Sequence, residues 1–128
     1  ADDLSFSSQE TITENHQNEI IKTIVNEGFQ VNTKKTRLQR NTGKQRVTGL
    51  KVNEKVNVDR KYIRSIRGML NRWEKSGLDQ ALLANQTPQN FLNILQGKLG
   101  FLKMVKTESD PVYLRLHNQM LQLLAGIA

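Results

Sequence analysis

The sequence predicts an α+β fold that is mainly α-helical, with one helix and short antiparallel strands followed by a helical bundle. Two observations predict it. Apolar and polar residues alternate in several short stretches before residue 56, as they do in half-buried strands. After that point, apolar residues recur at spacings of three and four behind clear helix-start signals. We therefore expect two parts, residues 1–56 and 57–128.

The first part is expected to hold one helix between short strands. Alternation predicts strands at residues 4–8 and 29–32. Residues 11–14 match a capping box with Thr11 at the N-cap and Glu14 three positions on, so a helix should run to about Glu27 and end at Gly28. Its inward face should carry Ile20, Ile21, Ile24 and Val25.

A hairpin is expected later in the first part. The turn signal at residues 41–44, Asn-Thr-Gly-Lys, lies between two strand-like segments, residues 36–40 and 45–52. Gly49 interrupts the second segment, which indicates either a β-bulge or the close approach of another backbone.

The second part should contain a short helix and three longer ones. Asp59 is the expected N-cap of a helix over residues 60–76 that Gly77 ends, and a short helix should follow at 78–84. Thr-Pro at 87–88 and Asp-Pro at 110–111 are start signals for two more helices, the first reaching about Lys106. The inward residues of these two helices should be Phe91, Leu92, Leu95, Leu99, Leu102, Tyr113, Leu116, Met120, Leu123 and Ile127.

Composition excludes several classes of site. The chain has 128 residues and no cysteine, so disulfides, zinc–thiolate sites and thiol catalysis are excluded. No apolar run approaches the roughly 18 to 20 residues of a membrane-spanning helix, and no membrane partner is expected. The first residue is not Met, and the start has no signal-peptide pattern, so we expect a processed or excised chain.

The positive charge is concentrated in the middle of the sequence. Residues 1–30 carry one basic and six acidic residues, residues 31–75 carry fourteen basic and three acidic ones, and the remainder four basic and three acidic ones. The formal net charge is +7. A concentrated basic block suggests a polyanionic partner that binds at one place.

The helix expected at 60–76 divides this charge from the apolar residues. At 100° per residue, one arc carries Tyr62, Ile63, Ile66, Met69, Leu70 and Trp73. The opposite arc carries Arg60, Lys61, Arg64, Arg67, Asn71, Arg72 and Lys75, with Gly68 in its middle. Nucleic acid is the favoured partner of this arc, although a solvated basic face also fits. Gly68 fits either close approach of a sugar-phosphate backbone or a helix–helix packing contact.

Five segments, in order, resemble the reverse transcriptase family. Residues 1–8, Ala-Asp-Asp-Leu-Ser-Phe-Ser-Ser, resemble the Tyr-x-Asp-Asp catalytic motif directly after its Tyr. Residues 28–37 resemble the following palm motif, and residues 45–53, with Val-Thr-Gly at 47–49, are similar to the primer grip of retron-type enzymes. Residues 57–73 and the Gly-Lys-Leu-Gly-Phe of residues 97–101 resemble two thumb elements.

The resemblance implies a catalytic role for a few residues. Asp2 and Asp3 would be metal ligands in a two-Mg²⁺ site, because oxygen ligands suit Mg²⁺ and paired metals stabilise both oxygens in phosphoryl transfer. The third carboxylate of that site would come from outside this sequence. Lys35 would lie near the phosphates of the incoming nucleotide, and Lys34 is a rival for that role. Without the resemblance, an Asp-Asp pair is a weak signal and fits a solvated acidic turn better than a metal site.

The resemblance also implies a nucleic-acid surface, in which the hairpin positions the primer end and the basic helix grips the duplex. Its expected residues are Arg46, Thr48, Gly49, Lys51, Arg60, Lys61, Arg64, Arg67, Gly68 and Arg72. Residues 1–56 would be the end of the palm and residues 57–128 the thumb, that is, a C-terminal piece of the enzyme that is inactive by itself.

The function implied is RNA-directed DNA synthesis in the bacterial cytoplasm. The partners would be an RNA template, a DNA primer, deoxynucleotide triphosphates and, for retron enzymes, a cognate structured RNA with a part in phage defence. Two rival interpretations remain: a non-catalytic RNA-binding module that needs no metal, and a protein-interaction domain that uses the leucine-rich C-terminal helix.

Overall fold

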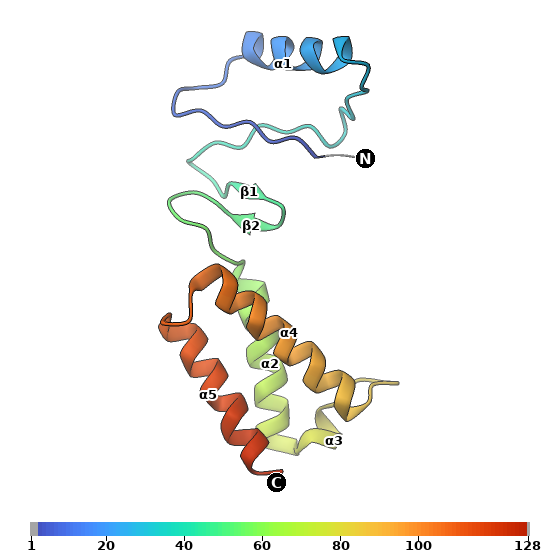
Figure 1. The fold of residues 1–128 in the computed structure, drawn as a ribbon, viewed down its shortest axis with the longest axis vertical. Helices are drawn as coiled ribbons and strands as arrows, with labels where there is room; N and C mark the ends of the chain where they lie inside the picture. Colours follow the sequence, from blue (N-terminus) through green and yellow to red (C-terminus); the bar gives the residue numbers. More distant parts are fainter. Residues whose placement is uncertain (1–2, 128) are drawn as a thin grey trace. The chain divides into compact units, whose positions relative to one another are not determined.

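The computed structural model describes residues 3–127, which form two compact units that divide between Gly43 and Lys44. The elements are α1 (Glu14–Asn26), β1 (Arg46–Val47), β2 (Leu50–Lys51), α2 (Arg60–Ser76), α3 (Leu78–Ala81), α4 (Pro88–Lys106) and α5 (Pro111–Ala125) (Figure 1). A mainly helical chain with a two-stranded antiparallel sheet agrees with the predicted α+β class.

Helix α1 begins two residues later than expected. Its N-cap is Thr13, whose hydroxyl accepts the backbone N–H of His16 at 3.3 Å, while His16 Nδ1 accepts the N–H of Thr13 at 3.1 Å. This reciprocal pair is the capping box that was predicted for Thr11 and Glu14, with an imidazole in place of the carboxylate. The predicted end is confirmed, because Gly28 follows the helix with a φ of 88°.

The strands predicted at residues 4–8, 29–32 and 36–40 are wrong. Within residues 3–43 no backbone pairs in a ladder, and an unpaired segment is not a strand. Asn32 instead organises a turn: its carbonyl accepts the N–H groups of Lys35 and Thr36, each at 3.1 Å, and its Oδ1 accepts that of Lys34 at 3.1 Å. Local turn chemistry therefore replaces the expected strand end.

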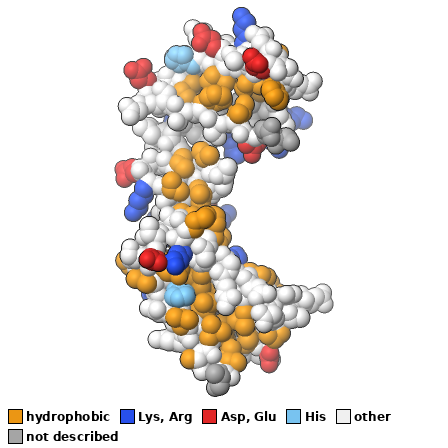
Figure 2. All heavy atoms as spheres, viewed as in Figure 1, with side chains coloured by type: hydrophobic (Ala, Val, Ile, Leu, Met, Phe, Trp, Pro, Cys, Tyr) orange, Lys and Arg blue, Asp and Glu red, His pale blue; other side chains and the backbone are white. Residues whose placement is uncertain are grey.

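The unit before Lys44 has no buried residue in its described part. Ile20, Ile21 and Ile24 are only half-buried, and Val25, predicted to face inward, is 54% exposed. Hydrophobic side chains gather on the visible surface of this unit (Figure 2). In the described part of this unit, the most exposed large hydrophobic residues are Leu4, Phe6, Val25 and Phe29. The apolar face of α1 is thus only partly covered by the rest of its unit.

The hairpin folds at Thr48 and Gly49, not at residues 41–44 as predicted. Strands β1 and β2 pair Arg46 with Lys51 and Val47 with Leu50, so only two residues connect them. Their φ angles are 48° and 81°, and positive φ at both residues gives the twist that two-residue hairpins favour. Gly49 is consequently a turn residue and not a bulge. Residues 40–43 do turn, with Gly43 N–H donating to Arg40 O at 3.1 Å, but no strands flank them.

The helical bundle follows its predicted signals closely. Helix α2 has Asp59 at its N-cap and ends before Gly77, as predicted. Thr87 caps α4 by accepting Asn90 N–H at 3.2 Å, and Asp110 caps α5 by accepting the N–H groups of the second and third helical residues. Helix α3 is shorter than expected: it ends at residue 81, whereas the predicted helix reached residue 84.

All buried side chains of the described chain lie in the second unit. They are Val58, Ile66, Met69, Leu70, Trp73, Ala81, Phe91, Leu95, Leu99, Leu102, Tyr113, Leu116 and Met120. Trp73 of α2 meets Phe91 of α4 edge-on, with ring centroids 6.1 Å apart. Of the inward residues predicted for the last two helices, only Ile127 is wrong: it lies past the end of α5 and is 54% exposed.

Candidate nucleic-acid interface

Helix α2 has one apolar and one cationic face, as its spacing predicts. Ile66, Met69, Leu70 and Trp73 are buried in the bundle core. The other side carries side chains that are exposed to solvent: Arg60, Lys61, Arg64, Arg67, Arg72 and Lys75. We call this set, with Gly68 between them, the α2 basic face. Burial of the apolar residues fixes the rotation of the helix, so the cations can only face outward.

Within residues 3–127, the cations of the α2 basic face have no acidic partner, because no carboxylate lies within 4 Å of any of them. Elsewhere in the same unit cations are paired: Lys103 lies 3.2 Å from Glu108, and Lys106 lies 3.6 Å from Asp110. Like charges at i and i+4, such as Arg60 and Arg64, cost a few tenths of a kcal/mol. An anionic ligand would remove this repulsion.

Gly68 does not serve as a helix-packing contact. A Cβ atom at this position would meet only Nη1 of Arg72, at 3.7 Å, among the described atoms outside the local helix backbone. The guanidinium of Arg72 therefore lies over the gap that the missing side chain leaves. Close approach of a ligand to the helix backbone is the interpretation of Gly68 that remains to be tested.

The hairpin is fixed to the start of α2 by an ion pair between Arg46 and Asp59. Partial burial opposes ionisation of Asp59, but the charges of Arg46 and Lys44 and the N–H dipoles at the helix start outweigh it, so the pKa of this carboxyl is lowered. Arg46, expected to contact nucleic acid, is thus engaged within the protein. Thr48 and Gly49 are exposed at the turn, and Lys51 is half-buried.

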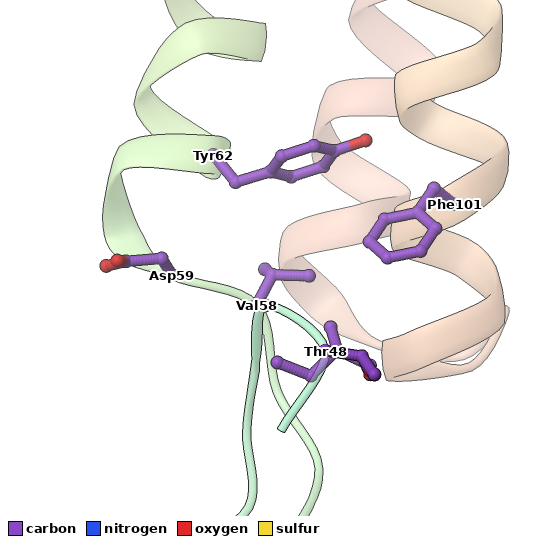
Figure 3. A pocket seen from close by; sticks show the side chains of 7 residues that line it. Thr48, Val58, Asp59, Tyr62 and Phe101 are labelled. Carbon is purple, nitrogen blue, oxygen red and sulfur yellow. The ribbon is translucent and has the colours of Figure 1, made fainter. Parts of the chain in front are cut away.

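A pocket of about 240 Å³ opens between the hairpin turn, the start of α2 and α4 (Figure 3). Its lining is mostly apolar and consists of Thr48, Gly49, Leu50, Val58, Asp59, Tyr62 and Phe101. The rings of Tyr62 and Phe101 meet edge-on at 5.5 Å, and Figure 3 shows the Asp59 carboxylate pointing away from them. The Tyr62 hydroxyl donates to the Lys98 carbonyl at 3.1 Å. Burial raises the pKa of the Tyr62 hydroxyl.

No role was predicted for Lys98 or Phe101, although both lie in the thumb-like Gly-Lys-Leu-Gly-Phe segment. Their spacing of three makes them neighbours on the surface of α4. The spacing does not reveal which helix packs against them, and only the packed structure shows that Tyr62 of α2 lies against both side chains.

The predicted catalytic residues lie in the first unit or outside the described residues. Asp2 lies outside them, and Asp3 is exposed. Lys34 and Lys35 are both exposed in the Asn32 turn. Within residues 3–127, no group of three Asp, Glu, His or Cys side chains could hold a metal ion. The described residues therefore do not by themselves form the expected Mg²⁺ site.

A packed helical domain with an unpaired cationic helix face is typical of proteins that bind a polyanion. Comparison with known proteins narrows this class of polyanion-binding proteins. Over 109 residues, the chain is 36% identical to the retron Mx65 reverse transcriptase of Myxococcus xanthus, a match that covers 84% of the chain. The chain is thus related in sequence to a retron reverse transcriptase, as its motifs indicate. It spans 23% of the length of that relative.

Neither a protein-family model nor a solved structure matches the chain. Among the helices of the described part, none is both long enough and apolar enough to cross a membrane.

Proposed function

We propose that the chain is the end of the palm and the thumb of a retron-type reverse transcriptase, an RNA-directed DNA polymerase. The observation that carries the proposal is the α2 basic face, which has no carboxylate partner among the described residues, in a chain 36% identical over 109 residues to a retron reverse transcriptase. Residues 1–56 would be the palm part and residues 57–128 the thumb.

In this proposal the α2 basic face grips the template–primer duplex. Its guanidinium and ammonium groups would contact backbone phosphates, which makes binding largely independent of sequence and steeply dependent on salt. Gly68 would admit the duplex backbone close to the helix. The turn at Thr48 and Gly49, held to the start of α2 by the ion pair between Arg46 and Asp59, would position the primer end.

The catalytic part of the proposal rests on the resemblance. Asp2 and Asp3 would contribute to a Mg²⁺ site that other parts of the enzyme complete, and Lys35 or Lys34 would lie near the nucleotide phosphates. Oxygen ligands suit Mg²⁺, and the exposed carboxylate of Asp3 is free to approach it. The partners would be an RNA template, a DNA primer, deoxynucleotides and a cognate structured RNA, in the bacterial cytoplasm.

Primer extension by the intact enzyme tests this function. Asp2→Asn should abolish DNA synthesis on an RNA template and leave binding of an RNA–DNA hybrid within the range of the unaltered protein. Asp79→Asn, which removes an exposed acid of α3, is the matched control and should leave both unchanged.

The primer-extension experiment also distinguishes a polymerase from the rival function, a non-catalytic RNA-binding module. If the unaltered intact protein binds the hybrid but synthesises no DNA under any divalent cation, the chain is a non-catalytic RNA-binding module. By itself, the 128-residue chain should bind the hybrid weakly and incorporate no nucleotide. Nucleotide incorporation by the purified chain alone would refute that part of the proposal.

A further inference from the structure

Lys98 of α4 is a half-buried cation whose contacts within the described part of the chain are not acidic. Its Nζ donates to Ser65 Oγ at 2.8 Å and lies 5.3 Å from the centroid of the Tyr62 ring. The Ser65 hydroxyl donates to the Tyr62 carbonyl at 2.8 Å. In the part of the chain that the structure describes, no carboxylate lies within 4 Å of this ammonium group.

These contacts hold the ammonium group without neutralising it. An ammonium has three N–H donors, and Ser65 accepts one of them. The Tyr62 ring offsets part of the cost of burying the charge, but it brings no negative charge. The other two lysines of α4, Lys103 and Lys106, each have a carboxylate partner. Lys98 is thus a preorganised cation with donors left for an anionic ligand.

The position of Lys98 connects it to the α2 basic face. Ser65 lies four residues after Lys61 and seven before Arg72, so the three share one side of α2 with Gly68. Arg72 folds its guanidinium back over Gly68. Because Lys98 reaches Ser65 from α4, the edge of the basic face that adjoins α4 continues onto a second helix.

We propose that Lys98 binds a backbone phosphate of the nucleic acid at this edge, beside Lys61 and Arg72, and that Ser65 positions its ammonium group. The ligand class is a phosphodiester, and the site would let α2 and α4 hold the same strand. This inference rests on the proposed function, because it adds a contact to the nucleic-acid surface assigned to α2.

The test measures how binding of an RNA–DNA hybrid by the full chain depends on salt. Each phosphate contact contributes about 0.9 to the slope of log K against log salt. Lys98→Gln should lower the slope by about that amount, so a fourfold increase in salt weakens the variant about 3.5-fold less than the unaltered protein. Lys103→Gln is the matched control, because it removes an exposed, carboxylate-paired lysine from the same helix and should leave the slope unchanged.

Ser65→Ala distinguishes phosphate binding by Lys98 from the positioning of Lys98 by Ser65. This variant keeps the charge of Lys98, so the salt slope should stay the same, while affinity for the hybrid falls at every salt concentration. If Lys98→Gln lowers the melting temperature and leaves the slope unchanged, Lys98 is only a structural link between the helices, and the proposal is overturned.

A second measurement needs no variant and applies even if Lys98→Gln does not fold. The hybrid should abolish acylation of Lys98 by an amine-reactive reagent and spare that of Lys103, as read by mass spectrometry. Undiminished acylation of Lys98 overturns the proposal. So does equal protection by millimolar inorganic phosphate alone, because the site would then take a free anion.

Failure of this inference can be told apart from failure of the proposed function. If neutralising Arg60, Arg64 and Arg67 lowers the salt slope but Lys98→Gln does not, the nucleic-acid surface stands and ends at α2. If neither change alters the slope, the assignment of α2 fails, and the role of Lys98 fails with it.

Discussion

Neutralising three arginines of the α2 basic face gives a quantitative test of how the chain grips nucleic acid. Arg60, Arg64 and Arg67 follow one another at spacings of four and three, are exposed, and have no carboxylate within 4 Å in the described part of the chain. Replacing all three by Gln should therefore break no ion pair among the described residues. Removal of the i, i+4 repulsion should leave stability equal or higher by a few tenths of a kcal/mol.

The effect on binding follows from counterion release. Three lost phosphate contacts, at about 0.9 each, should lower the salt slope by about 2.7. Between about 50 and 200 mM salt, affinity of the variant should then fall about 40-fold less than that of the unaltered protein. Fluorescence anisotropy with a labelled RNA–DNA hybrid over a series of salt concentrations measures both slopes.

The control removes the same charge from other places. Lys22, Lys55 and Arg115 are exposed residues of α1, of the loop after β2 and of α5, and replacing them by Gln also lowers the net charge by three. This variant should keep the slope of the unaltered protein. Equal slopes for the two triple variants would show that only net charge matters, and the assignment of the interface to α2 would then be wrong.

Three further predictions concern single residues. Gly68→Leu should weaken hybrid binding. It should also raise helix stability by up to about 1 kcal/mol, because a Cβ there meets only Arg72 Nη1 at 3.7 Å. Unchanged hybrid affinity would exclude close approach of the duplex backbone to the helix. Thr48→Asn should stabilise the hairpin against denaturant, because a β-branched residue is costly at a φ of 48° and Asn-Gly suits this turn; a lower denaturation midpoint would contradict the assigned geometry. Asp110→Ala should cost about 1 kcal/mol at neutral pH, because it removes the cap of α5. Partial burial opposes ionisation of Asp110, but the N–H groups of α5 and the Lys106 ammonium lower its pKa, so this stability is present above pH 3.8 and lost on acidification below it. Denaturation of both proteins across pH should show the difference shrinking in acid, and a constant difference would count against an ionised cap.

The helices could be predicted because their start signals act within a few residues. Thr87 before Pro88, and Asp110 before Pro111, place a side-chain acceptor opposite the first free N–H groups, whatever the rest of the chain does. The apolar spacing of α2 then determined which of its faces is buried. These are local properties, so the sequence alone contained them.

The strands could not be predicted in the same way, because a strand depends on a partner that alternation does not specify. Residues 29–32 alternate, but the Asn32 turn satisfies the following backbone N–H groups locally. The hairpin was predicted to turn at residues 41–44, and Gly49 was interpreted as a bulge or as a close approach of another backbone. The chain turns at Thr48 and Gly49 instead, although Thr is unfavourable at positive φ, so residue preference alone does not indicate this turn.

The candidate site was only partly predictable for a related reason. The cations of α2 lie on one helix, so periodicity places them together. The contacts of Lys98 with Ser65 and Tyr62 join residues 33 and 36 positions apart, and no pattern in the sequence indicates them.

The hairpin turn and the α2 basic face are connected by several contacts, so we expect them to move together. The ion pair between Arg46 and Asp59 connects β1 to the residue that starts α2, and the backbone of Lys51 pairs with that of Asn57 in both directions, at 2.8 and 2.9 Å. Leu50 packs against the same core that buries Ile66 and Leu70. A displacement of α2 must therefore carry Thr48 and Gly49 with it. If the basic helix holds the duplex and the turn positions the primer end, as proposed, both contacts move together, so the helix cannot shift along the duplex without also moving the primer terminus.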